Sequence, residues 1–273
     1  MTNSHPLYTK CKDYDPTKHD CKWYQLKLDG HWACIENSPN GVSITTRRPT
    51  DITAKLRWHE CYGLGHRMPV GCAVLGEIWL PGHPSWDIKT AINEKNSNLR
   101  FTAFAVARGL SPETSLPDVM LWCHAQGFET SVVYDEPPFG FGDMPPDVEG
   151  YVGKDGNLIG WRKWKPVRTM ELIVKGRTPG EGKHAGRIGA LVCKTFCGCE
   201  VAKVSGMTDE HRKEITEMFS NDTLNGRVVE VAYQEVTSKG RLRFPRFRCF
   251  RPDKAPELCT LNQDSQLLEY WNR

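Results

Sequence analysis

The run Tyr24-Gln25-Leu26-Lys27-Leu28-Asp29-Gly30 places a lysine among apolar residues directly before an Asp-Gly pair. This pattern is typical of a strand that ends in a tight turn. We therefore expect Lys27 at a strand end, where neighbouring cations and burial would lower its pKa and make its amine a nucleophile. The alternative is an ordinary surface lysine before a hairpin turn, because a match this short is weak by itself.

Strand and helix signals alternate along the first 165 residues. Strands are expected at residues 22–36, 42–46, 72–80, 99–106 and 128–134, and helices at residues 50–58, 85–94 and 116–126. Residues 149–154 and 158–165 predict a hairpin around Asp155-Gly156-Asn157, and the Pro- and Gly-rich residues 137–146 predict a loop. These elements together indicate an α+β fold with antiparallel sheets.

The pattern changes after Pro166. Strands are expected at residues 169–174, 188–193, 200–204, 227–235 and 241–250, with a glycine-rich loop at 175–189 and one helix from Thr208 to about 219. Short strands with a single helix suit a small OB-type barrel. We therefore expect two domains, residues 1–167 and residues 168–273, the second ending in a C-terminal tail.

Composition is that of a soluble globular protein, with 39% hydrophobic and 25% charged residues among 273. No apolar stretch is long enough to span a bilayer, and the first residues lack a secretory signal. We expect a cytoplasmic protein with no membrane partner, located in the host cytoplasm if the protein is viral. The net charge of +3 is mild, but cations concentrate in residues 162–168 and 239–254.

Eleven cysteines raise the question of disulfides or a metal. Without a secretory signal, we expect free thiols in a reducing cytoplasm. Two clusters stand out, and neither has the paired C-x-x-C spacing of a structural zinc site: Cys11, His19 and Cys21, and Cys193, Cys197 and Cys199. Ordinary thiols are the default interpretation of both.

Six short motifs follow the lysine motif in sequence. They are Thr46-Arg47-Arg48, Gly76-Glu77-Ile78, Phe104-Ala105-Val106, Glu149-Gly150-Tyr151-Val152-Gly153-Lys154, Trp161-Arg162-Lys163-Trp164-Lys165-Pro166, and residues 243–254. Together with Lys27-Leu28-Asp29-Gly30, they resemble the motifs of the ATP-dependent DNA ligases, within the covalent nucleotidyltransferases. Each motif is weak alone, but the complete series in order, from roughly Trp23 to Lys254, is strong.

The resemblance implies a nucleotidyltransferase domain with ATP-grasp-like antiparallel sheets and helices, followed by an OB domain. It also implies sealing of 5′-phosphate/3′-hydroxyl nicks in duplex DNA, as in replication or repair. Lys27 would attack the α-phosphate of ATP, AMP would pass to the 5′-phosphate, and the 3′-hydroxyl would displace AMP. The implied cofactors are ATP and Mg²⁺, or Mn²⁺ in its place, and the implied partner of a monomeric enzyme is nicked double-stranded DNA.

Residue roles follow from the same resemblance. The catalytic lysines would be Lys27, Lys163 and Lys165, the last two facing one side of a strand because they alternate with Trp164. The nucleotide would contact Gln25, Leu26, Arg47, Glu77, Phe104, Lys163, Lys165 and Arg251. The metal would be held by Asp29, Glu77 and Glu149. DNA would contact Arg48, Lys175, Arg177, Lys183, His184 and Arg187, and the motif that closes over ATP would be Arg248, Arg251, Asp253 and Lys254.

Two positions depart from the family pattern. Trp32 stands where the family usually has an arginine, two residues after Gly30, so Arg47 or Arg48 would have to compensate. Leu75 replaces the usual aspartate before Gly76, while Glu77 is retained. With 26 residues before Lys27, the chain resembles a minimal ligase of the type found in phages and some bacteria.

Three other functions stay open. An mRNA-capping guanylyltransferase shares K-x-D-G and the Arg251-Pro252-Asp253-Lys254 ending, and an RNA ligase shares the lysine motif. A catalytically inactive relative could bind nicked or single-stranded DNA, although Lys27, Lys163 and Lys165 argue against it. For single residues the simpler alternatives are a salt bridge for each glutamate, plain core for Phe104, and a solvated loop for the basic residues.

Overall fold

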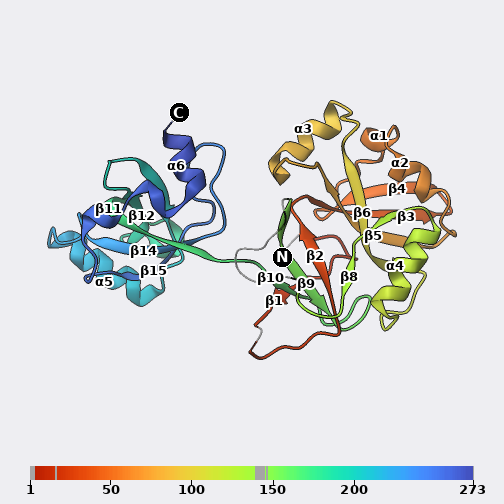
Figure 1. Ribbon diagram of the computed structural model, residues 1–273, viewed down its shortest axis with the longest axis horizontal. Coiled ribbons are helices and arrows are strands. Elements are labelled where there is room, and N and C mark those ends of the chain that lie inside the picture. Colours follow the sequence, from red (N-terminus) through yellow and green to blue (C-terminus); the bar gives the residue numbers. More distant parts are fainter. Residues whose placement is uncertain (1–3, 16, 139–144, 146, 273) are drawn as a thin grey trace. The chain divides into compact units, whose positions relative to one another are not determined.

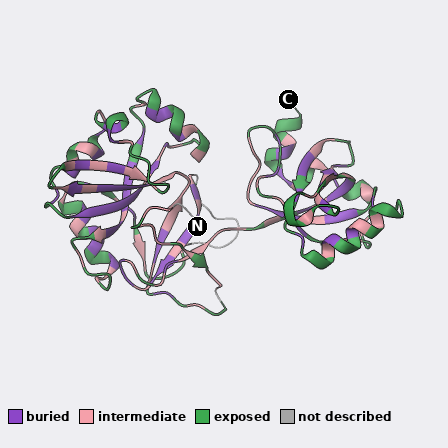
Figure 2. Ribbon diagram, turned by 180° about the vertical axis from the view of Figure 1, so that it is seen from behind, coloured by how far each residue is buried: buried purple, intermediate pink, exposed green. Residues whose placement is uncertain are grey.

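Two separate cores of buried apolar side chains organise the chain. The computed structural model describes residues 4–15, 17–138, 145 and 147–272. It divides into two units, Met1–Lys165 and Pro166–Arg273. Figure 2 shows buried residues concentrated on the strands of each unit, with exposed residues on helices and loops. In the described part of the chain, no helix has the length and apolarity needed to cross a bilayer.

The first unit contains a five-stranded sheet in the order β4–β3–β5–β6–β7. Its strands are β3 (His31–Ser38), β4 (Gly41–Thr46), β5 (Ala73–Trp79), β6 (Arg100–Arg108) and β7 (Glu129–Thr130). One face, with Val74 and Ile78 of β5, packs on the helices (Figure 1). These are α1 (Thr53–Leu56), α2 (Glu60–Gly65), α3 (Ile88–Asn93), which follows η1 (Ser85–Asp87), and α4 (Leu116–Ala125). Because strand side chains alternate, Glu77 lies on the opposite face with Leu75.

A second five-stranded sheet, in the order β1–β10–β9–β2–β8, supplies the other layer. Its strands are β1 (Lys12–Asp13), β2 (Trp23–Leu28), β8 (Val133–Tyr134), β9 (Val148–Lys154) and β10 (Arg162–Trp164). Its outer face is an aromatic cluster in which Trp164 stacks on Tyr151, with ring centroids 4.9 Å apart. Its inner face packs through Val152, and through Trp161 beside β10, against Leu75 of the first sheet. Lys27, Glu149 and Glu77 come from the strands of these two sheets.

The second unit is a barrel with the strand order β13–β12–β11–β14–β15. The strands are β11 (Arg168–Pro179), β12 (Ile188–Lys194), β13 (Glu200–Val204), β14 (Val228–Tyr233) and β15 (Arg246–Phe250). A parallel bridge between Ser205 and Arg246 joins the two edges, and Phe247 N donates to Ser205 O at 2.8 Å. Helix α5 (Asp209–Ser220) connects β13 to β14, with the Thr208 hydroxyl accepting from His211 N at 3.1 Å as its cap. The α+β class with a terminal OB barrel is therefore confirmed.

Two predicted elements of the second unit differ in extent. The glycine-rich loop expected at 175–189 is shorter, because β11 continues to Pro179 and pairs with β12 beyond a bulge after Val174. The remaining turn contains η2 (Gly182–His184). The strand expected at 241–250 begins only at Arg246, since Pro245 has no N–H to donate and Phe244 has a φ of 51°.

Other boundaries also shift. The helix expected at 50–58 is two short helices, α1 and α2, and the strand expected at 128–134 is divided between β7 and β8, which join different sheets. Most of the loop expected at 137–146 lies outside the described residues. The C-terminal tail contains η3 (Pro256–Leu258), η4 (Leu261–Gln263) and α6 (Ser265–Trp271), which begins where the Asp264 carboxylate accepts from Gln266 N at 2.9 Å.

Asn157 joins the loop between β9 and β10 to β6. Its amide oxygen accepts from Val106 N at 2.9 Å and its amide nitrogen donates to Val106 O at 2.6 Å, all in the interior. We predict that Asn157→Ala lowers the free energy of unfolding of the first unit by about 3 kcal/mol, because two buried backbone groups lose their partners. Urea unfolding followed by tryptophan fluorescence measures this, since eight of nine tryptophans lie at or before residue 164.

The matched control is Asn98→Ala, at an exposed asparagine of the same unit. Its effect should stay within about 0.5 kcal/mol. Equal unfolding midpoints for the two variants would contradict the structural role of Asn157.

Candidate active site

Glu149 joins a lysine on a strand of the inner face to a lysine that directly follows another strand. The amine of Lys27, on β2, and that of Lys165, directly after β10, each donate to a different oxygen of the Glu149 carboxylate. All three side chains are about three-quarters buried, at 25%, 23% and 22% exposure for Lys27, Lys165 and Glu149. Two ammonium groups are thus held around one carboxylate. A multiply charged anion can accept charge-assisted hydrogen bonds from both of them.

Two glycines allow this close approach. A Cβ at Gly30 would lie 2.7 Å from Cγ of Glu77, so only glycine lets the turn after Lys27 pass so near that residue. Gly150 has a φ of 148°, and a Cβ there would collide with the Trp164 carbonyl oxygen. The Asp-Gly and Glu-Gly pairs therefore have a steric reason in this fold.

Glu77 is the second carboxylate near the lysines. It lies opposite Trp32 in the β3–β5 ladder, on the face directed toward the second sheet. Burial raises the pKa of Glu77 to about 8, with Lys27 opposing and Glu149 adding to the effect. A cation close to Glu77 would therefore favour its ionised form.

The charge state of Lys27 differs from the sequence-based expectation. Burial by itself would lower its pKa, but the carboxylates of Glu149 and Glu77 outweigh burial and raise it. Burial would likewise raise the pKa of Glu149, and Lys27 and Lys165 reverse that shift and lower it. The prediction of a lowered lysine pKa is wrong for this arrangement, because the nearest charges are negative rather than positive.

A magnesium ion fits these residues only in part. Among the described residues, no group of three or more His, Cys, Asp or Glu side chains is placed to hold a metal. Asp29 is engaged elsewhere, since one of its carboxylate oxygens accepts from Ser85 N at 3.1 Å. Glu77 and Glu149 remain, and Mg²⁺ commonly takes one or two carboxylates together with substrate phosphates and water. The carboxylate pair fits an ion that phosphates help to bind.

A buried lysine, Lys154, lies beside the residues expected to contact adenine. Its amine donates to the Gln25 amide oxygen at 2.6 Å and to the Phe104 carbonyl at 2.7 Å, and the side chain is 1% exposed. It also lies 4.0 Å from the centre of the Trp161 ring. The amide nitrogen of Gln25 donates to the Met120 sulfur at 3.3 Å. Both ends of Gln25 are thus engaged within the protein, which sequence reasoning did not anticipate.

The remaining predicted residues of the first unit occupy varied positions. Lys163 pairs with Asp13 at 3.4 Å and is 40% exposed, so only Lys165 of the two strand lysines reaches Glu149. Leu26 pairs with Tyr151 in the β2–β9 ladder. Phe104 is half-buried, with its ring edge-on to Trp161 at 5.7 Å. Arg48 is exposed.

An aromatic group from the N-terminal segment was missed. The Arg47 guanidinium lies 4.2 Å from the centre of the Tyr8 ring, and the Tyr8 ring meets Trp32 edge-on at 5.7 Å. His5 completes the group, 5.3 Å from Trp32, with its backbone N donating to Arg47 O at 2.6 Å. Burial raises the pKa of the Tyr8 phenol, while the nearby Arg47 and Lys27 oppose that shift. The unusual Trp32 was the only sequence signal for this group.

In the second unit, Arg251 is surrounded by carboxylates. It donates twice to Asp253, at 2.9 and 2.7 Å, and to Glu171 and Glu230 at 3.0 and 3.1 Å. Arg248 is exposed and lies 4.0 Å from Glu230, and Lys254 closes the turn through its backbone N to Arg251 O. Arg251 is therefore held in place, and binding a phosphate would replace some of these carboxylate contacts.

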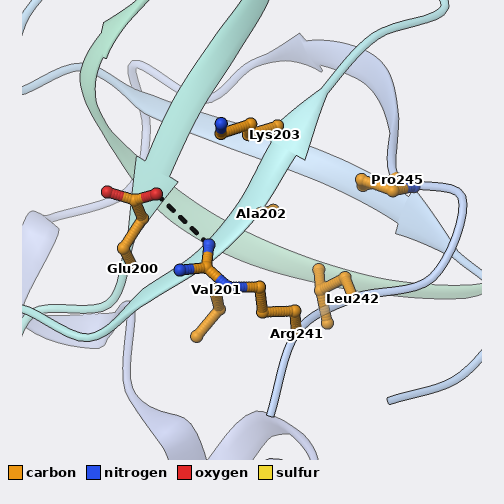
Figure 3. Close-up of a pocket in the computed structure, with 7 residues that line it drawn as sticks. All are labelled: Glu200, Val201, Ala202, Lys203, Arg241, Leu242 and Pro245. Atoms are coloured by element: carbon orange, nitrogen blue, oxygen red, sulfur yellow. Dashed lines mark hydrogen bonds and ion pairs between the residues drawn. The ribbon is translucent and has the colours of Figure 1, made fainter. Parts of the chain in front are cut away.

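The predicted DNA-facing residues of this unit are mostly exposed. Lys183 and Arg187 are exposed, Arg177 lies 4.0 Å from the Phe219 ring, and Lys175 pairs with Glu200 at 3.4 Å. His184 is half-buried beside Asp209 at 3.6 Å. None of them lines the pocket in Figure 3, which lies between β13 and residues 241–245, where Arg241 reaches Glu200 at 3.2 Å.

Phe244 is a further exposed residue that the sequence did not single out as a contact. Its side chain is 59% exposed and its backbone has a φ of 51°, which is costly for a bulky residue. Arg243 lies 5.1 Å from its ring. An exposed aromatic in a strained conformation is a candidate contact for a partner.

The fold is a two-sheet α+β unit followed by an OB barrel, and comparisons with known proteins agree with it. Residues 179–251 match the family model of the DNA ligase OB-like domain. A solved structure named "Pmar-Lig_Pre." matches with a TM-score of 0.70 and 20% identity, over 89% of this chain and 67% of the other. Another, described as "DNA binding with a minimal scaffold: Structure-function analysis of Lig E DNA ligases", matches with a TM-score of 0.67 and 18% identity, over 89% and 98%.

Among curated proteins, DNA ligase 2 of Methanosarcina acetivorans is 36% identical over 129 residues. That match covers 38% of this chain and 22% of the relative, so the chain spans less than a quarter of that relative's length. These comparisons confirm the resemblance to the DNA ligases and the two-part fold.

Lys154 generates a prediction about pH. Burial lowers the pKa of Lys154 from 10.5 to about 7, so between these values unfolding takes up a proton. The free energy of unfolding of the wild type, relative to Lys154→Met, should therefore rise with pH from about 7 to 10, by at most about 1.4 kcal/mol per unit. Urea unfolding of both proteins at several pH values measures this difference.

The control is Lys89→Met, at an exposed lysine of the same unit. Its difference from the wild type should not change over the same pH range. A pH-independent difference for Lys154→Met as well would show that Lys154 stays protonated in the folded protein.

Proposed function

We propose that this protein is an ATP-dependent DNA ligase that seals 5′-phosphate/3′-hydroxyl nicks in duplex DNA through a lysyl-AMP intermediate on Lys27. The observation that carries the proposal is the contact of Lys27 and Lys165 with the two oxygens of Glu149, beside Glu77, in a unit followed by a DNA ligase OB-like domain. In this proposal the first unit performs adenylation, and the second binds DNA. The protein would act as a monomer in the cytoplasm.

The first step would transfer AMP from ATP to Lys27. The amine forms a bond to the α-phosphorus, the bond from that phosphorus to the bridging oxygen breaks, and pyrophosphate leaves. The raised pKa means that Lys27 is protonated while Glu149 holds it. Lys27 must therefore lose this proton before it attacks. Phosphate oxygens that draw Lys165 away from Glu149 would begin to break the contacts among Lys27, Lys165 and Glu149.

Lys165 and Lys163 would stabilise charge on the phosphates. Both alternate with Trp164 along the chain, so they face the side of the strand opposite to Trp164, which stacks on Tyr151 at the outer face. Lys165 is already placed beside Lys27, whereas Lys163 would leave its exposed partner Asp13 to join it. Bound Mg²⁺ would supply further neutralisation of phosphate charge, held by Glu77 and Glu149.

The later steps need DNA. AMP passes from Lys27 to the 5′-phosphate, and the 3′-hydroxyl then attacks that phosphate and releases AMP. The exposed cations Lys175, Arg177, Lys183 and Arg187 would contact phosphates of the backbone, and Phe244 would contact sugar or base edges. Arg251 and its neighbours would bind the leaving pyrophosphate.

The lysine assignment is tested with ATP labelled at the α-phosphate. We predict that Lys27→Ala abolishes both labelling of the protein and ATP-driven sealing of a nicked duplex, because no amine remains to form the phosphoramidate. Lys89→Ala, at an exposed lysine, should keep both activities. Wild-type labelling of Lys27→Ala would refute the nucleophile assignment.

The same assay identifies the donor. Labelled GTP and NAD should leave the wild type unlabelled, and transfer of GMP would instead favour a capping guanylyltransferase. A pre-adenylated nick should still be sealed by Lys27→Ala at a measurable rate, since the final step does not require the lysyl-AMP bond.

A second prediction concerns Tyr8 and Arg47. Tyr8→Leu removes the ring beneath the guanidinium, a contact worth about 1 kcal/mol, and should lower kcat/KM for sealing about threefold to tenfold. Tyr8→Phe retains the ring and should behave as the wild type. In an Arg47→Ala background, Tyr8→Leu should have no further effect. Equal losses with and without Arg47 would indicate that Tyr8 acts through the general packing of the N-terminal segment.

A further inference from the structure

The turn between β12 and β13 brings two cysteines together. Thr195 N donates to Cys199 O at 2.9 Å and Gly198 N donates to Thr195 O at 3.0 Å, which closes a tight hairpin turn. Gly198 has a φ of 94°, a value that glycine adopts without strain. As a result, the sulfur atoms of Cys197 and Cys199 lie 3.5 Å apart without any movement of the strands.

The two thiols have unequal environments. Cys197 is exposed, and Cys199 is half-buried. The Thr195 hydroxyl lies 3.2 Å from the Cys197 sulfur, and its hydrogen bond lowers the pKa of that thiol. Burial raises the pKa of Cys199. An exposed thiol with a lowered pKa is the one that reacts first, and a neighbouring thiol is then placed to resolve the product.

We propose that Cys197 and Cys199 form a redox site that is oxidised reversibly to an intramolecular disulfide by low-molecular-weight disulfides such as glutathione disulfide. The Cys197 thiolate attacks one sulfur of the oxidant, forming a mixed disulfide and releasing one thiolate. Cys199, after losing its proton, attacks the Cys197 sulfur and releases the second thiol. Two electrons pass from the cysteine pair to the oxidant, which is reduced to two thiols.

The geometry of the turn favours a disulfide within the turn, between Cys197 and Cys199, that is readily reduced. Of the other cysteines of the second unit, Cys193 and Cys259 are buried and therefore poorly accessible to an external disulfide, while Cys249 is exposed on a different strand, β15. A disulfide requires sulfurs about 2.05 Å apart, so the turn must tighten from the observed 3.5 Å. A bond across a single intervening residue in a closed turn is strained, and strained disulfides are readily reduced.

The site adjoins charged residues of the barrel. Cys199 is followed by Glu200, whose carboxylate accepts from Lys175 at 3.4 Å and Arg241 at 3.2 Å (Figure 3 shows the Arg241 contact). Tightening the turn would shift the start of β13, where Glu200 is located. The thiol chemistry is defined by this turn alone and is independent of any ligase activity.

The experiment uses the full chain and mass spectrometry of one peptide. Trypsin cleavage after Lys194 and Lys203 releases residues 195–203, which contain Cys197 and Cys199 and no other cysteine. After treatment of the folded protein with glutathione disulfide and blocking of free thiols with a maleimide, we expect this peptide unlabelled and lighter than its dithiol form by two hydrogen atoms. Dithiothreitol before blocking should restore double labelling.

Variants separate the steps. Cys199→Ser should accumulate glutathione on Cys197, since no thiol resolves the mixed disulfide, and Cys249→Ser, at the other exposed cysteine, should leave oxidation of the peptide unchanged. The proposal is overturned if the wild-type peptide keeps two labelled thiols, if it retains glutathione on Cys197, or if Cys197 is instead linked to Cys193 or Cys259.

Discussion

The site of this protein depends on one largely buried carboxylate, Glu149, which accepts from Lys27 on β2 and from Lys165 directly after β10. Three charged side chains that are about three-quarters buried would be costly unless they compensate one another. The pairing fixes the spacing of β2, β9 and the end of β10, and it keeps Lys27 as an ammonium ion. The proposed reaction therefore begins from an ion-paired state, which the phosphates of ATP must disrupt.

The two-layer construction of the first unit makes this pairing possible. One face of the β3–β6 sheet is committed to the helices, and the other, with Glu77, is directed toward the β2–β9 sheet. The outer face of that second sheet is sealed by the stacked Tyr151 and Trp164, which leaves the alternate positions for charged groups. Lys154, Gln25 and Phe104 extend the same inner face with a buried polar contact that no short motif marks.

The second unit has two separate groups of chemically notable side chains, one around Arg251 and one in the β12–β13 turn. Arg251 is held by three carboxylates, so its position is fixed before any phosphate is present. The β12–β13 turn, by contrast, has a redox-capable pair of thiols that neither the lysine nor the arginine motif requires. Phe244 and the exposed cations form the surface proposed for DNA, and their shared feature is exposure rather than convergence in a pocket.

The sequence by itself predicted the element types, the α+β class with its OB barrel, and Glu77, Glu149 and Lys165 as neighbours of Lys27, although Lys163, predicted with them, pairs with Asp13 instead. These follow from local rules, because alternation fixes which side of a strand a residue faces, as in Lys163-Trp164-Lys165, and Asp-Gly and Glu-Gly pairs mark close turns. Some strand boundaries depend on hydrogen bonds to a neighbouring strand, as in the extension of β11 to Pro179, and the local rules do not predict them.

Only the tertiary structure decided the charges and the partners. Whether Lys27 is protonated depends on Glu149, 122 residues away, and whether Gln25 is free depends on Lys154, 129 residues away. Tyr8 meets Arg47 only because the N-terminal segment crosses the end of β4. Distances of this kind are set by packing between layers, and a linear pattern carries no information about which of several possible neighbours a side chain will contact.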